Sequence, residues 1–401
     1  MKVLFISPNS PFESIGGIER YVINLINYYK NQTEVDFFLV LPTKEENRIV
    51  KEGSVTIYFD TSLSVSGDTT RDHAEIVDKA RLFAELVEKI IKEQNISIIC
   101  AENIMFSVPA SYSLWLNMIA NTYKIPLVLR LHMYPASDLQ IALTTQLLWN
   151  KISCVSRSVS GDCFQKGAYI DNLSTDYLGV NTANFNQHHD PTYKLREKLH
   201  LSEDTKIILT ASRIIRGPKN ILQEKGIINL IQAFAKLSIR YPKLHLVIGV
   251  GKATENLKNH FTSAYEMLLG YIKIHNIEKQ TTVKMFELDE MPHVYRDSDL
   301  FVLAPEDHET FGQTFIESMA CGLPVIGANT GGIPEIISDS YNGYLVPPGD
   351  SSILAQRIES LIKNDTVRDK FIKAGIKTIE ENFTSDKQFL SFQKMLEKTK
   401  F

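Results

Sequence analysis

The chain has 401 residues, of which 44% are hydrophobic and 22% are charged, a composition typical of a globular protein that buries its own core. This length favours two domains over one. The formal net charge is −4. Residues 1–190 include 16 basic and 21 acidic residues, and residues 191–401 include 27 basic and 26 acidic residues. Neither part therefore has the basic excess of a nucleic-acid-binding domain.

Short apolar runs alternate with amphipathic stretches in the first half of the chain. Strands are expected at 2–7, 35–40, 96–100, 126–132 and 151–156. Apolar residues at helical spacing predict helices at 18–26 and 73–93. This alternation predicts a parallel sheet with helices on both faces.

A polar stretch without periodicity, 179–193, interrupts this pattern. Beyond it, strands are expected at 206–212, 244–251, 281–286, 299–305 and 323–328, and helices from 226, from about 313, and at 351–364, 366–382 and 386–398. The sequence thus predicts an α/β protein with two Rossmann-like, doubly wound domains, 1–185 and 186–380, that face a central cleft. A C-terminal helix at 381–401 could pack back on the first domain.

Targeting and redox signals are absent from the sequence. The four cysteines are Cys100, Cys154, Cys163 and Cys321. No two of them have the spacing of a zinc or redox motif. The first apolar run ends at Ile6, too early for a signal peptide, and no apolar stretch reaches the roughly 18 residues of a spanning helix. We expect a cytoplasmic protein and leave peripheral contact at the inner membrane face open.

Glycines follow two of the predicted strands, where doubly wound sheets bind ligands. Gly16 and Gly17 precede the first helix, and Gly249 and Gly251 end the strand 244–251. Glycine lets backbone amides approach a ligand, and a helix N-terminus favours an anion. Plain tight turns are the alternative. The spacing differs from the Gly-x-Gly-x-x-Gly fingerprint, which argues against a nicotinamide enzyme.

Cations follow the strand 206–212, at Arg213, Arg216, Lys219 and Lys225. Cations at the carboxyl end of a parallel strand can bind a diphosphate. The alternative is that these cations lie in a solvated loop without a ligand.

Two carboxylates, Glu309 and Glu317, lie on either side of Gly312. The amides of Gly312, Gln313 and Thr314 are expected to be first-turn donors with a partial positive charge. Eight residues at helical rise span about 12 Å. A diphosphate at the helix start would therefore have one carboxylate for sugar hydroxyls and one for ribose hydroxyls. A surface position is the alternative for Glu317.

This stretch resembles the signature of the retaining glycosyltransferases of family 4, whose fold is called GT-B. The similarity comprises Glu309, Phe311-Gly312, Glu317 and "MACGLPV", and it continues through "GGIPEII" and "NGYLVPPGD". "GVNTANF", "KGIINLIQAFAKL" and "GGIERYVINL" also resemble the family's linker, phosphate-loop helix and N-terminal glycine loop. The resemblance covers essentially the whole chain.

The resemblance implies roles for matched residues. Arg213 and Lys225 would hold the donor diphosphate, Glu309 and His132 would lie near the transferred sugar, Glu317 would bind the ribose, and Gly17 would approach the phosphates. We therefore expect catalytic roles for His132, Arg213, Lys225 and Glu309. Donor-binding roles are expected for Gly16, Gly17, Gly249, Gly251, Phe311, Gly312, Gln313, Thr314 and Glu317.

Three positions depart from the family pattern. The spacing from Arg213 to Lys225 is longer than usual, so Lys219 remains the alternative phosphate lysine. His132 precedes a methionine where the family often has aspartate, and Gln313 occupies a position that is often aliphatic.

An Asp-x-Asp sequence at Asp297 and Asp299 has the form of a metal-binding motif in other glycosyltransferases. Asp299 directly precedes the strand that starts at Leu300, where the family also has an acid, so we expect a structural role. No metal and no cofactor are expected, because cations and helix amides can stabilise the diphosphate.

The function implied is a metal-independent, retaining hexosyltransferase. The donor would be a nucleotide-diphosphate sugar, with uridine as the commonest base in the family. The acceptor hydroxyl would belong to a glycan, a lipid-linked molecule or a small molecule. A nucleotide-sugar epimerase of the same architecture and a non-catalytic nucleotide-sugar-binding protein are the alternatives.

Overall fold

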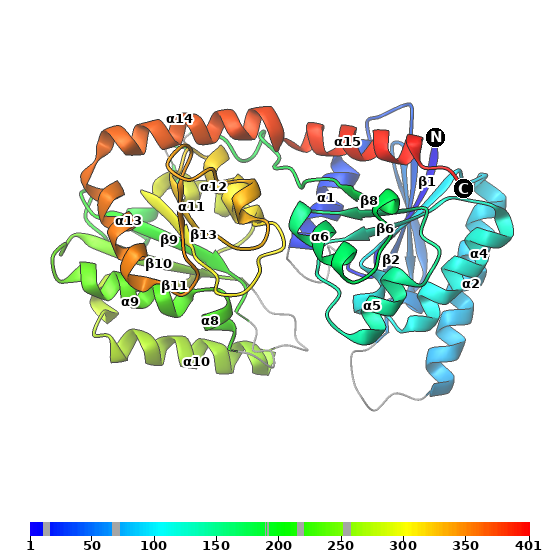
Figure 1. Cartoon of the computed structure of the whole chain (residues 1–401), viewed down its shortest axis with the longest axis horizontal. Helices are drawn as coiled ribbons and strands as arrows, with labels where there is room; N and C mark the ends of the chain where they lie inside the picture. The colour runs from blue at the N-terminus through cyan, green and yellow to red at the C-terminus, as the bar shows by residue number, and fades with distance from the viewer. Residues whose placement is uncertain (11–16, 66–72, 189, 191, 215–219, 252–257) are drawn as a thin grey trace. The chain divides into compact units, whose positions relative to one another are not determined.

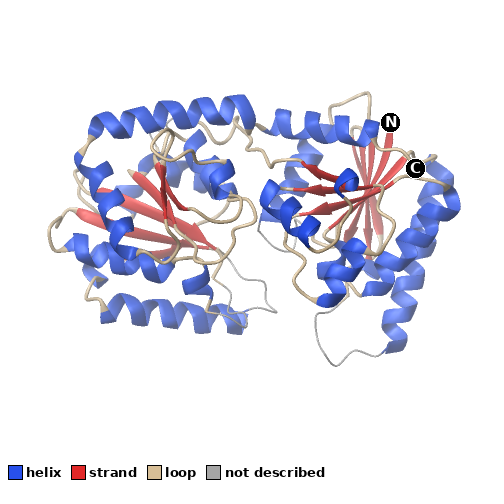
Figure 2. Cartoon of the chain, viewed as in Figure 1, coloured by secondary structure: helices blue, strands red, loops and turns tan. Residues whose placement is uncertain are grey.

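The computed structural model describes all residues except 11–16, 66–72, 189, 191, 215–219 and 252–257. The chain divides into two compact units. Unit 1 comprises Met1–Leu178 and Asp386–Phe401, and unit 2 comprises Gly179–Ser385. In each unit, helices cover both faces of a central sheet (Figure 2).

Unit 1 is built on an eight-stranded sheet in the order β3-β4-β2-β1-β5-β6-β7-β8. Its strands are β1 (Lys2–Ile6), β2 (Asp36–Pro42), β3 (Arg48–Glu52), β4 (Val55–Asp60), β5 (Ile98–Glu102), β6 (Leu127–Leu131), β7 (Lys151–Cys154) and β8 (Leu173–Thr175). Its α-helices are α1 (Gly17–Tyr29), α2 (His73–Gln94), α3 (Ile104–Ser107), α4 (Ala110–Tyr123), α5 (Asp138–Thr145), α6 (Arg157–Gln165) and α15 (Ser385–Lys398). All neighbouring strands pair in parallel except β3 and β4.

The antiparallel β3–β4 pair was not predicted from the sequence. β3 is an edge strand whose residues are almost all exposed, so it lacks the apolar run that marks a buried strand. The strands β4 and β8 were not predicted either, whereas β1, β2, β5, β6 and β7 were predicted from such runs. The side chains of Val3 to Ile6 in β1 are fully buried.

The C-terminal helix α15 belongs to unit 1 (Figure 1). The hydroxyl of Tyr29 in α1 donates a hydrogen bond to the carbonyl of Phe389 at 3.1 Å. The guanidinium of Arg130 in β6 lies 5.5 Å from the ring centroid of Phe392, within the range of a cation–π contact. These contacts, and the full burial of both phenylalanines, anchor the end of the chain in the core of unit 1.

Unit 2 has a fully parallel six-stranded sheet in the order β11-β10-β9-β12-β13-β14. Its strands are β9 (Lys206–Ser212), β10 (Leu244–Val250), β11 (Thr281–Met285), β12 (Leu300–Leu303), β13 (Val325–Ala328) and β14 (Tyr344–Val346). Its α-helices are α7 (Leu195–Lys198), α8 (Ile221–Glu224), α9 (Ile227–Ser238), α10 (Lys258–Ile274), α11 (Met291–Asp297), α12 (Gln313–Ala320), α13 (Ser351–Lys363) and α14 (Asp365–Asn382).

The strand order of unit 2 determines which loops meet. β9 lies between β10 and β12, and all three run in the same direction. The residues that follow these strands therefore gather at one edge of the sheet, where ligands bind in doubly wound folds.

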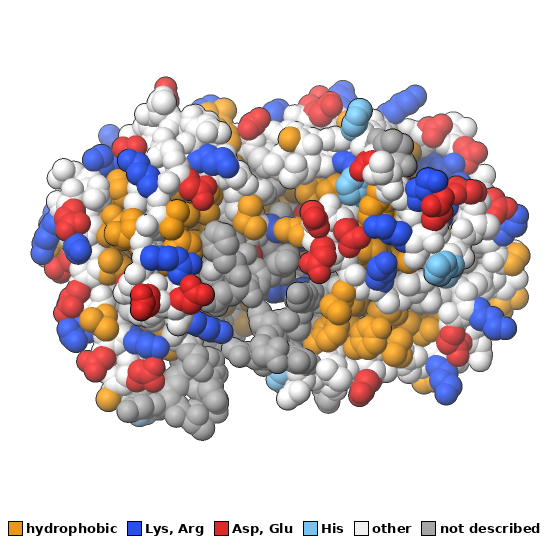
Figure 3. Space-filling view, turned by 180° about the vertical axis from the view of Figure 1, so that it is seen from behind, with side chains coloured by type: hydrophobic (Ala, Val, Ile, Leu, Met, Phe, Trp, Pro, Cys, Tyr) orange, Lys and Arg blue, Asp and Glu red, His pale blue; other side chains and the backbone are white. Residues whose placement is uncertain are grey.

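On the face of the molecule shown in Figure 3, basic and acidic side chains are interspersed, in line with the small formal net charge of −4.

Candidate functional site

The first element of the site is the connection from β12 to α12 in unit 2. Helix α12 begins after Gly312, which has a backbone φ of 103° and no side-chain cap. A β-carbon at Gly312 would lie 2.9 Å from Cδ2 of Phe315, so both the backbone conformation and the packing require glycine. The side-chain oxygen of Gln313, in the first turn, is buried and has no hydrogen-bond partner among the residues that the structure describes.

An ion pair joins this connection to the segment before α9. Nζ of Lys225 lies 2.9 Å from Oε2 of Glu309, and the two side chains are 32% and 17% exposed. The Glu309 carboxylate raises the pKa of Lys225, whereas burial and the charge of Arg213 act in the opposite direction. Two residues predicted for the diphosphate and the sugar are thus in direct contact.

Glycine makes this approach possible. Gly226 has a φ of 67°, and a β-carbon there would lie 1.7 Å from the carbonyl oxygen of Ala304. The backbone that begins α9 therefore packs directly on the end of β12. The amide of Glu306 also donates to the carbonyl of Glu224 at 3.0 Å, which holds the two segments together.

Two further glycines, Gly331 and Gly332, contact the backbone carbonyl of Glu309. The amide of Gly332 donates to the carbonyl oxygen of Glu309 at 2.8 Å. Gly331 has a φ of 57°, and a β-carbon there would lie 2.0 Å from the same oxygen. The glycines of "GGIPEII" thus hold the Glu309 loop in place.

Glu317 lies in α12, and only 1% of the residue is exposed. Its Oε2 accepts a hydrogen bond of 3.1 Å from the hydroxyl of the buried Tyr295 in α11. The alternative reading of Glu317 as a surface residue is therefore wrong. Phe311 is also buried, and its ring packs against Phe383 with centroids 5.9 Å apart. The side chain of Thr314 is partly buried.

Arg213 follows β9 and is exposed. Gly251 follows the neighbouring strand β10, and a β-carbon there would lie 2.8 Å from Cγ of Arg213. The amide of Gly251 also donates to the carbonyl of Ser212 at 3.1 Å. A β-carbon at Gly249, within β10, would lie 3.5 Å from Cβ of Ala211, which is ordinary packing. Arg213 and Gly251 therefore lie side by side at the same edge as Lys225.

Several side chains of this edge were not singled out in the sequence. The carboxylate of Glu306 accepts hydrogen bonds from Nδ2 of Asn229 at 2.7 Å and from Nε2 of Gln223 at 2.9 Å. An open cavity of about 500 Å³ is lined by Asn220, Gln223, Glu224, Glu306 and Asp307. The acidic residues directly after the strand 299–305 were the available sequence signal for this cavity.

The remaining predicted residues belong to unit 1 or to undescribed segments. Gly17 is the first residue of α1. Gly16, and the alternative lysine Lys219, lie outside the described residues.

His132 follows β6 and is 5% exposed. Its Nε2 lies 3.0 Å from Oε1 of the fully buried Glu102. Its ring packs edge-on against Tyr21 with centroids 4.9 Å apart. Burial lowers the pKa of His132, while the Glu102 carboxylate acts in the opposite direction.

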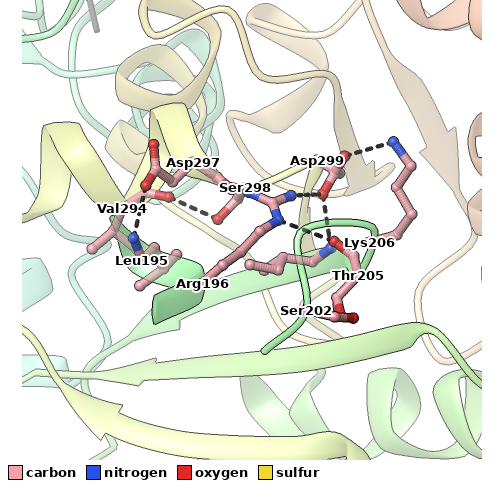
Figure 4. Close-up of polar contacts among 10 residues, drawn as sticks. Leu195, Arg196, Ser202, Thr205, Lys206, Val294, Asp297, Ser298 and Asp299 are labelled. Carbon is pink, nitrogen blue, oxygen red and sulfur yellow. Dashed lines mark hydrogen bonds and ion pairs between the residues drawn. The ribbon is translucent and has the colours of Figure 1, made fainter. Parts of the chain in front are cut away.

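Both carboxylates of the Asp-x-Asp sequence make contacts within unit 2 (Figure 4). The carboxylate of Asp299 pairs with Arg196 at 2.7 Å and with Lys206 at 3.0 Å, and it accepts the amide hydrogen of Ile207. Asp297 accepts the amide hydrogen of Leu195. Asp299 precedes β12 and therefore lies at the amino edge of the sheet, whereas Arg213 and Glu309 follow strands at the carboxyl edge.

The described part of the chain holds no group of three or more His, Cys, Asp or Glu side chains arranged to bind a metal ion. None of the described helices is long and apolar enough to cross a membrane.

Comparison with known proteins places this geometry in context. Residues 192–378 match the family model "Glycosyl transferases group 1". The N-acetyl-alpha-D-glucosaminyl L-malate synthase of Bacillus anthracis is 28% identical over 48% of this chain and 46% of its own length. The capsular polysaccharide biosynthesis glycosyltransferase CapM of Staphylococcus aureus is 28% identical over the same shares. The chain spans about half the length of the curated relatives it matches.

Solved structures match over nearly the full chain. A glycosyltransferase of Rickettsia africae has a TM-score of 0.77 at 20% identity and covers 99% of this chain and 98% of its own. HepE of Anabaena, in complex with UDP and glucose, has a TM-score of 0.74 at 18% identity and covers 99% of both chains. The predicted GT-B fold class, with two parallel-sheet α/β domains, is confirmed. The segment that matches the model of the group 1 glycosyl transferases, residues 192–378, includes both members of the Lys225–Glu309 pair.

Proposed function

We propose that this protein is a metal-independent, retaining glycosyltransferase that transfers a hexose from a UDP-sugar to an acceptor hydroxyl. The observation that carries the proposal is the Lys225–Glu309 pair, which lies beside the start of α12 at the carboxyl edge of the unit 2 sheet. Arg213 and Gly251 lie at the same edge. This edge combines cations, helix amides and carboxylates, the groups that a nucleotide sugar needs.

Donor binding would exchange the partner of Lys225. Its ammonium pairs with the Glu309 carboxylate at 2.9 Å. A diphosphate would offer Lys225 a stronger set of acceptor oxygens, which would release the Glu309 carboxylate for the sugar. Arg213 would hold the second phosphate, and Glu317 would bind the ribose from within α12.

Transfer with retention would occur on one face of the sugar. The bond between the anomeric carbon and the diphosphate oxygen breaks, and its electron pair leaves with UDP. The acceptor oxygen forms the new bond on the same face, and its proton passes to the departing diphosphate. Cations and helix amides stabilise the charge that develops on the leaving group. In this proposal unit 1 supplies Gly17 near the phosphates and His132 near the sugar, and it selects a glycan, lipid-linked or small-molecule acceptor.

The central experiment is a donor screen. Purified protein is incubated with UDP-, GDP- and ADP-linked hexoses, and release of free sugar is measured without acceptor. Slow hydrolysis of a UDP-hexose to UDP and the sugar of retained configuration is expected. Interconversion of the intact donor would support the epimerase alternative, and binding without any turnover would support the non-catalytic one.

Removal of metal ions is expected to leave donor binding and hydrolysis unchanged. The carboxylates of the Asp-x-Asp sequence are engaged with Arg196, Lys206 and backbone amides at the other edge of the sheet, and cations face the expected diphosphate. UDP affinity is measured by calorimetry with EDTA and with Mg²⁺. A chelator that abolishes both affinity and hydrolysis would refute metal independence.

Arg213→Ala is expected to weaken UDP binding by about 1.5–3 kcal/mol, the typical range for a hydrogen bond to a charged group. The matched control is Arg240→Ala, because Arg240 is also an exposed arginine of unit 2 but pairs with Glu359. The control should bind UDP like the wild type. Equal losses in the two variants would show that Arg213 acts only through overall charge.

A further inference from the structure

Two consecutive residues at the end of β5 contact His132 in unit 1. The side-chain oxygen of Asn103 accepts a hydrogen bond of 2.8 Å from the backbone amide of His132. Oε1 of Glu102 lies 3.0 Å from Nε2 of the imidazole. Asn103 adopts a left-handed backbone conformation with a φ of 45°, which asparagine tolerates better than most residues. Both the backbone and the ring of His132 are therefore held from one short segment.

The contacts of Glu102 indicate no role for this residue other than its interaction with His132. Its side chain is fully buried, and apart from the 3.0 Å contact with Nε2 of His132 neither carboxylate oxygen has a hydrogen-bond partner in the described part of the chain. The nearby guanidinium of Arg130 is directed elsewhere, since it donates to Ser153 at 2.5 Å and to the carbonyl of Asp176 at 2.9 Å. A buried carboxylate without a partner is costly. The 3.0 Å contact with His132 is the interaction that accounts for its presence.

The surroundings of His132 restrict its ring. Tyr21 packs edge-on against the imidazole with an interplanar angle of 69°, and the histidine is 5% exposed. Burial and the charge of Arg130 lower the pKa of His132, while Glu102 and Glu19 act in the opposite direction. With its pKa below the ordinary value of 6.5, the imidazole is neutral at pH 7, and one ring nitrogen carries a hydrogen.

We propose that Glu102 is a positioning residue for His132: it accepts the Nε2 hydrogen, selects one tautomer of the neutral imidazole, and leaves Nδ1 as the ring acceptor for a substrate hydroxyl. The partner of one ring nitrogen decides the chemistry of the other. This inference rests on the proposed function, in which His132 lies near the transferred sugar. Glu102 itself touches no substrate.

The first test measures the tautomer directly and needs no activity. Histidine labelled with ¹⁵N is observed by NMR at pH 7, and the His132 signals are assigned with the His132→Gln variant. The wild type should show hydrogen on Nε2 alone. Glu102→Leu, which removes the acceptor, should populate both tautomers. Glu102→Gln, which keeps an acceptor oxygen, should restore the Nε2-protonated form.

The second test measures donor hydrolysis. Glu102→Leu should lower turnover about ten- to a hundredfold, the effect of losing one charge-assisted hydrogen bond, with KM for the donor unchanged. Glu102→Gln should recover part of the loss. The double variant Glu102→Leu/His132→Gln should be no slower than His132→Gln alone, because residues that act through one another are not additive.

A control separates positioning from a general effect on folding. Asp176→Asn also removes a buried carboxylate of unit 1, one that accepts a hydrogen bond from Ser153. Thermal unfolding of both variants is measured, and Asp176→Asn should keep the wild-type tautomer whatever its loss of stability.

Three outcomes would count against the inference or its basis. A single Nε2 tautomer in Glu102→Leu with wild-type turnover would overturn the inference, as would losses that multiply in the double variant. A wild-type protein that hydrolyses no nucleotide sugar would overturn the proposed function and the kinetic half of this inference. The tautomer measurement would still decide whether Glu102 selects the form of the ring.

Discussion

Glu309→Gln is expected to lower donor turnover about 10²- to 10³-fold, the typical cost of removing one preorganised electrostatic group, without weakening the binding of free UDP. The sugar develops positive charge as it leaves the diphosphate, and a carboxylate stabilises that charge more in the transition state than in the ground state. Glutamine keeps the shape and removes the charge. The loss should therefore appear in kcat rather than in UDP affinity.

The ion pair of Glu309 also predicts the direction in which UDP affinity should change in Glu309→Gln. Glu309 pairs with Lys225 at 2.9 Å, so the carboxylate would compete with phosphate for the same ammonium. Removing its charge should make UDP binding slightly tighter. UDP affinity by calorimetry and steady-state hydrolysis of the UDP-sugar give the two quantities.

Glu317→Gln is the matched comparison within the same motif. Glutamine keeps an oxygen that can accept the hydrogen bond of Tyr295, which Glu317 accepts at 3.1 Å. If Glu317 binds the ribose, this variant should weaken free UDP and the whole donor alike. Equal effects of the two substitutions on UDP would contradict the division of roles, and full activity of Glu309→Gln would contradict the site assignment.

Gly226→Ala is expected to destabilise unit 2 by about 2–5 kcal/mol and to abolish donor binding. A left-handed backbone at an alanine costs roughly 1–2 kcal/mol, and overpacking typically adds about 1–3 kcal/mol. The new β-carbon would lie 1.7 Å from the carbonyl oxygen of Ala304, so backbone must move. That movement would separate Lys225 from Glu309.

Gly270→Ala in α10 is the control for this substitution. A β-carbon at Gly270 would meet nothing within 4 Å, and alanine in a helix is favoured over glycine by roughly 0.5–1 kcal/mol. This variant should be as stable as the wild type or more so and should bind UDP normally. Chemical denaturation and UDP calorimetry measure both variants. Wild-type stability and affinity in Gly226→Ala would show that the packing between α9 and β12 does not determine the site.

Most of the fold could be predicted from the sequence because its signals are local. The strands β1, β9 and β12 are continuous apolar runs, and α9 and α13 have apolar residues at helical spacing. A buried parallel sheet needs both patterns. The exposed β3 has neither burial nor an apolar run, and its pairing with β4 could not be predicted for that reason.

The sequence by itself determined the doubly wound architecture, the family signature and the residue types of the candidate site. Only the tertiary structure decided which of these residues meet. Lys225 and Glu309 are separated by 84 residues, and they are brought together because β9 and β12 are neighbours and Gly226 lets the backbone approach Ala304. Glu102 and His132 meet because β5 and β6 pair in parallel. Sequence periodicity reports which face of an element is buried, but contacts between distant residues depend on strand order and on the few glycines that permit close packing.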